Sequence, residues 1–328
     1  MEVFRTTFEI PACERKICHK EKVLSIGSCF SDIIGDKLLQ GKFKVLANPY
    51  GVVYNPVSLF SLLSNALSDK EFPETLVLAK DERYFHYQVH SEINASSREE
   101  LLLLLRDTQR LVKRCLLEAS HVFITLGTAF VFELLEPKAL VANCHKQPAS
   151  RFARRMLEPD EMMAAFETYF QLQMAHNPNV EIVLTVSPVR HIREGMLRNQ
   201  VSKSQLRLLC HRLEKDFEKV SYFPSYELMM DDLRDYRFYK PDMIHPSGPA
   251  EDYVWEHFKA CYFDSGTSKL LKRVENVKQA LSHRPFNPRS NAHKEFLMRL
   301  LEKITEMPDY LDYSEEMEAI DKQIKQTA

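Results

Sequence analysis

Short apolar runs alternate with longer amphipathic stretches over the first 262 residues of the chain. The short runs, which predict strands, lie at residues 22–26, 43–47, 84–90, 121–126 and 181–186. The run at 84–90 alternates apolar and polar residues, as an exposed strand or hairpin does. The amphipathic stretches, which predict helices, lie at residues 30–39, 57–67, 96–117, 159–175, 202–220 and 249–262. Strands separated by helices predict a parallel sheet inside a three-layer α/β/α sandwich.

The pattern changes near residue 266. From there Arg, Lys and Glu recur at helical spacing, the segment RPFNPRSN at residues 284–291 interrupts the periodicity, and large apolar residues are few at the end. We therefore predict an α/β domain over residues 1–265 and a helical C-terminal extension over residues 266–328.

Composition narrows the range of partners. The 44 basic and 46 acidic residues nearly cancel, without the basic excess that draws a protein onto nucleic acid. The N-terminal sequence MEVFRTTFEI lacks the pattern of a secretory signal, and no uncharged apolar stretch approaches the ~20 residues that span a bilayer. The seven cysteines are odd in number and form no C-x-x-C pair, which favours reduced thiols. We expect a cytoplasmic protein without nucleic-acid or membrane partners, and the sequence does not indicate its oligomeric state.

Glycine is scarce, and its positions carry information. With only 8 glycines, the chain has neither the G-x-G-x-x-G fingerprint of dinucleotide-binding folds nor a P-loop. Five of them fall at predicted strand ends or in neighbouring loops, namely Gly27, Gly51, Gly127, Gly195 and Gly248. Ligands of open parallel sheets bind at the carboxyl ends of the strands, so the glycines favour a site at that edge. The alternative is that these turns need glycine for their geometry alone.

Two groups of residues at this edge suggest acyl-transfer chemistry. In the segment Asp242-Met-Ile-His245 the acid can accept the imidazole Nδ1–H and leave the other nitrogen free to act as a base. Ser28 and Cys29 follow the first predicted strand where a helix begins, and backbone N–H groups there can lower a thiol pKa or hold an oxyanion. Each feature has a simpler alternative, with Asp242 as a helix cap and Cys29 as a small buried residue of a turn.

Several separated blocks, in one order over about residues 5–262, carry a resemblance to a known family. They are Gly27-Ser28-Cys29-Phe30-Ser31, Asn48-Pro49-Tyr50-Gly51, Tyr54-Asn55-Pro56, Leu126-Gly127-Thr128, Asn143-Cys144-His145-Lys146, Ser187-Pro188-Val189-Arg190-His191 and Asp242-Met243-Ile244-His245-Pro246. Together they resemble the GSCFA family and, more broadly, the SGNH (GDSL-like) hydrolase superfamily. The resemblance implies a mainly parallel, flavodoxin-like sheet of the SGNH type and an enzyme that hydrolyses or transfers acyl esters through a nucleophile, Asp242 and His245.

The resemblance also suggests roles for individual residues, and the sequence departs from the superfamily motifs at two places. When the segment Gly27-Ser28-Cys29-Phe30 is aligned without gaps to the superfamily motif G-D-S-L, Cys29 occupies the position of the nucleophilic serine. A shift of the turn by one residue would give that role to Ser28, so both residues are candidates for the nucleophile. The superfamily's third block, G-x-N-D, reads Gly127-Thr128-Ala129-Phe130 here, and the oxyanion-hole asparagine is missing from its place. Asn143 could supply that amide or could stabilise a turn, and amides near Gly51 and Gly127 would complete the hole.

Further polar residues are candidates for substrate binding. The cationic groups of Arg190, His191, His145 and Lys146 could converge on a carboxylate or phosphate, or could be surface charges paired with nearby acids. The aromatic residues between positions 222 and 239 could stack on a sugar or pack in the core. We predict no metal site, because no cluster has the required spacing, and no cofactor.

Two hypotheses about function follow. In the first, Cys29 or Ser28 attacks the carbonyl of an acylated carbohydrate or a similar small ester, and His245, oriented by Asp242, moves the proton. Water as the second substrate gives an esterase, and a sugar hydroxyl gives an O-acyltransferase. In the second hypothesis, the domain is a non-catalytic binding module for a glycan or an acylated ligand.

Overall fold

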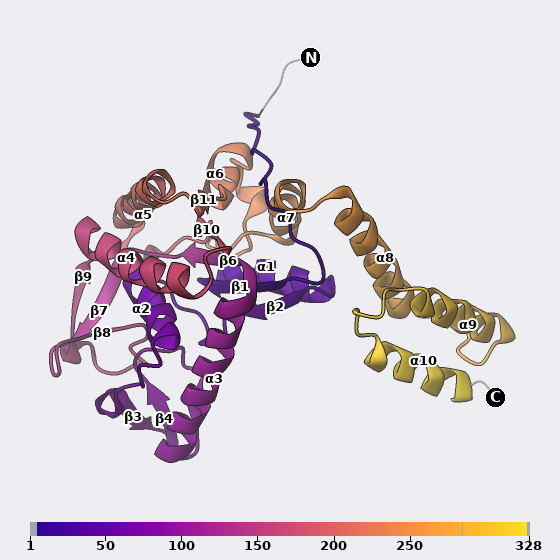
Figure 1. Cartoon of the computed structure of the whole chain (residues 1–328), viewed down its shortest axis with the longest axis horizontal. Coiled ribbons are helices and arrows are strands. Elements are labelled where there is room, and N and C mark those ends of the chain that lie inside the picture. Colours follow the sequence, from indigo (N-terminus) through magenta and orange to yellow (C-terminus); the bar gives the residue numbers. More distant parts are fainter. Residues whose placement is uncertain (1–4, 284, 327–328) are drawn as a thin grey trace.

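A five-stranded parallel sheet forms the centre of the molecule (Figure 1). The computed structural model describes residues 5–283 and 285–326. The sheet consists of β1 (Lys22–Gly27), β2 (Lys44–Ala47), β6 (Ala119–Leu126), β10 (Glu181–Val186) and β11 (Val220–Tyr222). Its spatial order is β11-β10-β6-β1-β2, with every pair parallel. Counted in chain order this is 2-1-3-4-5, the flavodoxin-like arrangement, which confirms the predicted sheet type.

Helices cover both faces of the sheet, so the predicted three-layer sandwich is confirmed (Figure 1). Successive strand residues point to opposite faces: Leu24, Val122 and Ile182 belong to one core cluster, and Val23, Phe123 and Val183 to another. The first cluster also takes side chains from α2 (Pro56–Leu67), α3 (Arg98–Glu118), α4 (Pro159–His176) and α5 (Met196–Asp216). The second takes them from α1 (Cys29–Gln40) and α7 (Gly248–Tyr262).

Helix starts follow the capping residues of the sequence. The side chain of Asn55 accepts the N–H of Ser58 at 2.8 Å, and Pro56 occupies the first helical position of α2. The side chain of Ser97 accepts the N–H of Glu100 at 3.1 Å at the start of α3. Each bond satisfies a donor that has no partner inside the helix, which fixes where the helix begins.

Two small antiparallel sheets lie beside the sandwich, and only one of their strands was expected. The first sheet contains β3 (Val77–Lys80), β4 (Arg83–His86) and β5 (Asn94–Ala95). The second contains β7 (Phe130–Leu134), β8 (Ala139–Val141) and β9 (Phe152–Met156). The strand predicted at 84–90 corresponds to β4, but it ends at His86. Leu76, Leu78 and Tyr87 pack with Leu134 and Val141, so the two sheets share one apolar cluster.

The helix predicted at residues 202–220 has different bounds in the structure. It begins at Met196, directly after Gly195, and ends at Asp216. Residues 220–222 form β11 instead, where Val220 pairs with Ile182 along the edge of the central sheet. Pairing with β10 overrides the helical spacing that the sequence suggested. Single turns of helix complete this part of the fold at α6 (Ser225–Glu227), η4 (Leu228–Asp232), η5 (Tyr236–Phe238) and η3 (Ile192–Glu194), with others at η1 (Glu74–Leu76) and η2 (Ala149–Arg151).

The C-terminal region is helical, as predicted, but it has more of an apolar core than its composition suggested. Helices α8 (Ser265–Ser282), α9 (Asn291–Thr305) and α10 (Ser314–Gln326) pack around a cluster that includes Val274, Leu297, Leu300, Ile304, Tyr313 and Ile320. Figure 1 shows these helices to one side of the sandwich, after α7, and this C-terminal bundle contacts the sandwich at the turn after α1. There the Lys42 ammonium pairs with Glu316 at 2.5 Å and donates to the Asp312 carbonyl at 2.7 Å.

Among the described helices, none combines the length and the apolar character that crossing a membrane requires.

Candidate active site

The end of β1 places Ser28 and Cys29 at the point where the strand order reverses. β1 lies between β2 and β6, and ligands of open α/β sheets bind outside the carboxyl ends of the strands at such a point. The Ser28 N–H donates to the Thr125 carbonyl of β6 at 3.0 Å, which holds the turn against the neighbouring strand. Cys29 is then the first residue of α1.

Ser28 and Cys29 differ in accessibility. Ser28 caps α1: its hydroxyl accepts the Phe30 N–H at 3.3 Å, and the residue is only 1% exposed. Cys29 is half-buried, and its sulfur is in no disulfide. Ser28 therefore has a structural role in the helix start, whereas the Cys29 thiol is the more accessible of the two candidate nucleophiles.

Burial dominates the electrostatics of the Cys29 thiol. Desolvation raises its pKa, and the nearby carboxylate of Asp32 raises it further. Lys203, the backbone N–H of Cys29 itself and Lys240 each lower the pKa, but their combined effect is smaller. The helix start therefore does not produce the low thiol pKa that the sequence suggested. Because the group is protonated near neutral pH, it needs a base before it can attack a carbonyl.

Asn48 connects the end of β1 to α1. Its Oδ1 accepts the Gly27 N–H at 2.8 Å, and its Nδ2 donates to Asp32 Oδ1 at 2.6 Å. This single side chain therefore fixes the turn on one side and the carboxylate next to Cys29 on the other.

Asp242 and His245 come together as their spacing predicted. Asp242 Oδ2 lies 2.7 Å from His245 Nδ1, and Oδ1 accepts the backbone N–H groups of Ile244 and His245 at 2.8 and 3.0 Å. The N–H groups of His245 and Ile244, followed by the imidazole, lower the pKa of Asp242 to about 2. Asp242 is therefore a carboxylate throughout the neutral range. With Nδ1 bonded to it, Nε2 is the nitrogen of His245 that can take a proton.

The loop that carries His245 is held against the end of β10. The Arg190 N–H donates to the Ile244 carbonyl at 3.2 Å, and its guanidinium donates to the Met243 carbonyl at 3.0 Å. The Lys240 N–H donates to the His245 carbonyl at 2.7 Å, and the charge of Lys240 acts on the Cys29 thiol. Thiol and imidazole therefore belong to the same edge of the sheet.

The two glycine N–H groups expected to form an oxyanion hole already donate hydrogen bonds within the protein. The Gly51 N–H donates to the Asn48 carbonyl at 2.7 Å, and the Gly127 N–H donates to the Tyr54 carbonyl at 2.8 Å. Asn143 stabilises a turn: its Oδ1 accepts the His145 N–H at 2.8 Å. Neither glycine N–H is free to bind an oxyanion in this structure, because each one donates to a backbone carbonyl in a loop.

Two of the four predicted substrate-binding residues lie at the site. The Arg190 guanidinium stacks 4.0 Å from the Tyr239 ring centre, beside the His245 loop. The His191 ring lies 5.7 Å from the Tyr54 ring, and burial followed by the charges of Lys203 and Arg154 lowers the pKa of His191 to about 4.

His145 and Lys146 lie on a turn beside the small antiparallel sheets instead. His145 is buried with its Nε2 2.9 Å from the His86 carbonyl of β4, and Lys146 is exposed. The structure therefore does not gather all four cationic groups at one point.

Lys203 is a site residue that the sequence analysis missed. It lies on α5, is only 1% exposed, and its Nζ donates to the carbonyls of Gly127 and Ser187 at 2.8 and 2.7 Å. A lysine in an amphipathic helix is normally predicted to lie on the solvent-exposed face. The signal that could have found it is the helical spacing of the buried positions, because Lys203 falls between Asn199 and Leu206 on the buried stripe of α5.

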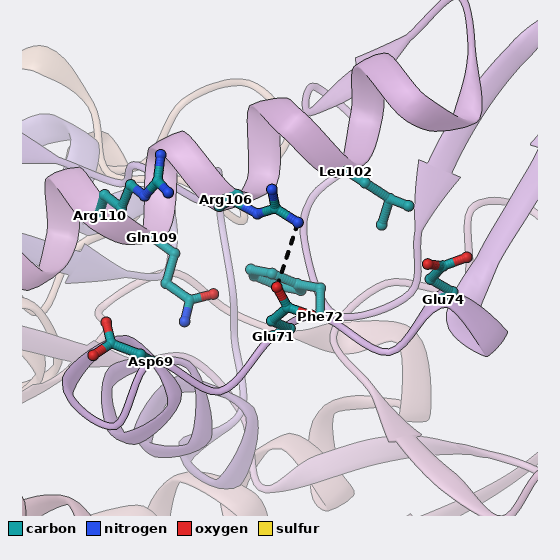
Figure 2. A pocket seen from close by; sticks show the side chains of 8 residues that line it. All are labelled: Asp69, Glu71, Phe72, Glu74, Leu102, Arg106, Gln109 and Arg110. Atoms are coloured by element: carbon teal, nitrogen blue, oxygen red, sulfur yellow. Dashed lines mark hydrogen bonds and ion pairs between the residues drawn. The ribbon is translucent and has the colours of Figure 1, made fainter.

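A cavity of about 430 Å³ adjoins the His245 loop. Its walls include Arg190, Tyr226, Tyr236 and Tyr239, together with Met229 and Met230. Part of the predicted aromatic stretch therefore lines a cavity, while Phe223 is packed in the core. Figure 2 shows another cavity, of about 370 Å³, between α3 and the segment that follows α2, where Arg106 pairs with Glu71 at 3.3 Å. That cavity shares no lining residue with the strand-end site.

Among the described residues, no group of three or more His, Cys, Asp or Glu side chains is arranged to hold a metal ion.

Comparison with protein-family models gives two matches. Residues 22–258 match the GSCFA family, and residues 274–326 match the GSCFA domain protein, C-terminal domain. A search of curated proteins finds no match. The first matched region covers more than half of the chain and contains Ser28, Cys29, Asp242 and His245.

Proposed function

The chain belongs to the GSCFA family, and we propose that it is an acyl-transfer enzyme that cleaves esters through a covalent intermediate on Cys29. The observation that carries the proposal is the Asp242–His245 pair at 2.7 Å, in a loop held to the end of β10 at the edge of the sheet where α1 begins with Cys29. A nucleophile, a base and an orienting acid are the three groups that this chemistry requires.

Each step of the proposed reaction uses one of these groups. His245 Nε2 takes the proton of the Cys29 thiol, and the thiolate attacks the ester carbonyl to form a carbon–sulfur bond. The tetrahedral intermediate expels the alcohol, which takes the proton back from His245, and a thioester remains. Water then gives its proton to His245 and attacks the thioester, which releases the acid and regenerates the thiol. A sugar hydroxyl in place of water makes the enzyme an O-acyltransferase.

The electrostatics favour a base-assisted mechanism over a preformed thiolate. Burial and Asp32 keep the Cys29 pKa high, so His245 has to accept the proton as the attack proceeds. Asp242 retains its negative charge because of its low pKa, and it stabilises the imidazolium that forms.

A relationship to the SGNH hydrolases is part of the proposal. It is supported by the 2-1-3-4-5 sheet order, by a nucleophile directly after the first strand and by an Asp-x-x-His loop before α7. The engaged N–H groups of Gly51 and Gly127 are the main departure. An oxyanion on the substrate would use the N–H of Cys29 at the start of α1, because the N–H groups of Phe30 and Ser31 are bonded to Ser28.

The cavity beside Arg190 suits an acylated carbohydrate or a similar small ester. Tyrosine rings offer flat faces to a sugar, and methionine side chains adapt to an acyl chain. The guanidinium of Arg190 lines this cavity and can donate to an oxygen of the substrate.

Ester hydrolysis tests the proposal. We expect wild type to hydrolyse short acyl esters and to show a transient mass increase of one acyl group. His245→Ala should hydrolyse them at least about a hundredfold more slowly, because proton transfer is lost. His211→Ala, at an exposed position of α5, is the matched control and should retain full activity. Equal rates in wild type and His245→Ala would refute the mechanism.

The Asp242→Asn variant should reduce ester turnover by roughly ten- to hundredfold, because an amide cannot stabilise the imidazolium. The effect should be smaller than for a buried acid, since both partners are more than 40% exposed and water screens their interaction. Steady-state kinetics and a thermal melt measure the change. Asp216→Asn, at an exposed position of α5, serves as control, and turnover equal to wild type in Asp242→Asn would exclude the orienting role.

The second candidate function is a non-catalytic binding module for a glycan or an acylated ligand. The engaged N–H groups of Gly51 and Gly127 favour it, because a preformed oxyanion hole would leave such donors free. Ligand binding that survives both Cys29→Ala and His245→Ala, with no turnover of any acyl ester, would support this alternative over the enzyme.

A further inference from the structure

The ammonium group of Lys203 is buried at the edge of the sheet where Cys29 stands. Its hydrogen bonds reach the carbonyls of Gly127 and Ser187, the residues that directly follow β6 and β10. Both partners are neutral, and among the described residues no carboxylate forms an ion pair with this lysine. Burying an ammonium group without a counter-charge is costly, and such groups are often functional.

The connection to Cys29 runs through the β1–β6 pair. The Ser28 N–H is bonded to the Thr125 carbonyl of β6, and Gly127, which accepts from Lys203, lies two residues further along the chain, just past the end of β6. The electrostatic coupling is mutual, since Lys203 lowers the pKa of Cys29 and Cys29 raises that of Lys203. The charge of each group therefore affects the protonation of the other.

Lys203 can keep its structural contacts in either protonation state. An ammonium has three N–H bonds and a neutral amine has two, and two are enough for the carbonyls of Gly127 and Ser187. Burial lowers the pKa of Lys203 to about 7. The charge can therefore respond to a change at Cys29 without a rearrangement of the two turns.

We propose that Lys203 is a positioning residue of the candidate site, which ties together the turns after β6 and β10 and places a positive charge beside Cys29. The charge stabilises the thiolate that forms when the proton leaves Cys29. The inference rests on the proposed function only in taking Cys29 as the reacting group.

Other charged or titratable groups face the pair from the surrounding elements. Asp32 on α1 opposes a thiolate, while Lys240 favours one but pairs its own ammonium with Glu251 at 2.9 Å. Tyr54 also faces Cys29, and on the lysine's side the neutral His191 and Tyr226 complete the surroundings. Of the two lysines that act on Cys29, Lys203 is the one without a carboxylate partner among the described residues.

The pH dependence of Cys29 alkylation tests the inference on the full chain. Iodoacetamide reacts with the thiolate, and peptide mass spectrometry separates Cys29 from the other cysteines. Lys203→Met removes the charge with little change in length, so Cys29 should react about five- to tenfold more slowly at pH 6–7, while the two rates should converge above about pH 9, where Lys203 is neutral in the wild type as well. Lys215→Met, at an exposed position of α5, should leave the profile unchanged. An unshifted profile in folded Lys203→Met would overturn the proposal.

A second experiment leaves Lys203 unchanged, so it tests the same proposal even if the Lys203→Met variant does not fold. Cys29→Asp places a fixed negative charge at the thiol position, and Cys29→Asn is its neutral counterpart of the same shape. In protein with 13C-labelled lysine, the Lys203 signal should titrate below the other lysines, and its midpoint should be at least about one pH unit higher in Cys29→Asp. Equal midpoints would overturn the proposal. Neither experiment uses an ester, so a failure of the proposed esterase activity would be seen separately.

Discussion

Replacing Cys29 by alanine should reduce the rate of acyl-ester hydrolysis by about a thousandfold or more, because the attacking atom is lost. The thiol is half-buried and fills no large space in the core, so the thermal midpoint should change little. The measurement is ester turnover together with mass spectrometry of the trapped acyl-enzyme, which should disappear in Cys29→Ala.

Ser28→Ala is the matched comparison, since it removes the neighbouring hydroxyl. Loss of the Ser28 hydroxyl removes the N-cap of α1 and should lower the free energy of unfolding by about 1 kcal/mol, while most of the ester-hydrolysis activity remains. Labelling with iodoacetamide and with a fluorophosphonate distinguishes the two groups. An adduct on Ser28, or full activity in Cys29→Ala, would give the nucleophile's role to the serine.

The Gly27→Ala variant should lose about 4 kcal/mol or more of its free energy of unfolding and should fold poorly. Gly27 has a φ of +142°, which side-chain-bearing residues rarely adopt, and an added Cβ would lie 2.2 Å from the Thr125 carbonyl oxygen. Relief of this contact would require β1 and β6 to separate at the point where their turns meet.

Gly248→Ala provides the control for this substitution. Gly248 begins α7, and an added Cβ meets no atom within 4 Å, so alanine should be neutral or stabilise the protein by up to about 1 kcal/mol. Denaturant unfolding of both variants gives the two values. A Gly27→Ala protein within 1 kcal/mol of wild type would contradict the close packing of β1 on β6.

The central strands could be predicted because they are buried on both faces. β6 and β10 read as continuous apolar runs, and such runs are typical of strands covered by helices on each side. β9 gave no such signal. It contains Arg154 and Arg155, and Arg155 pairs with Glu133 of β7 and Glu161 of α4, contacts that exist only after folding.

The candidate site was predictable where it depends on local spacing. Asp242 and His245 need only three residues of chain to meet, so the sequence revealed the pair. The N–H groups of Gly51 and Gly127 are bonded to loop carbonyls, and these bonds form only on folding. The local sequence therefore does not show that these donors are engaged. Lys203 was missed for a related reason, because its burial depends on the carbonyls of two distant strand ends.

Helix α1 carries the candidate nucleophile at one end and meets the C-terminal bundle at the other. Its 12 residues form a stiff rod about 18 Å long, with Cys29 at the start and Gly41, whose Cβ position would lie 2.8 Å from Leu271 of α8, just past the end. A force applied to the bundle would therefore reach the thiol along a single rigid element. Truncation of the C-terminal residues would remove the contacts that support α1, which carries the candidate nucleophile, as well as shorten the chain.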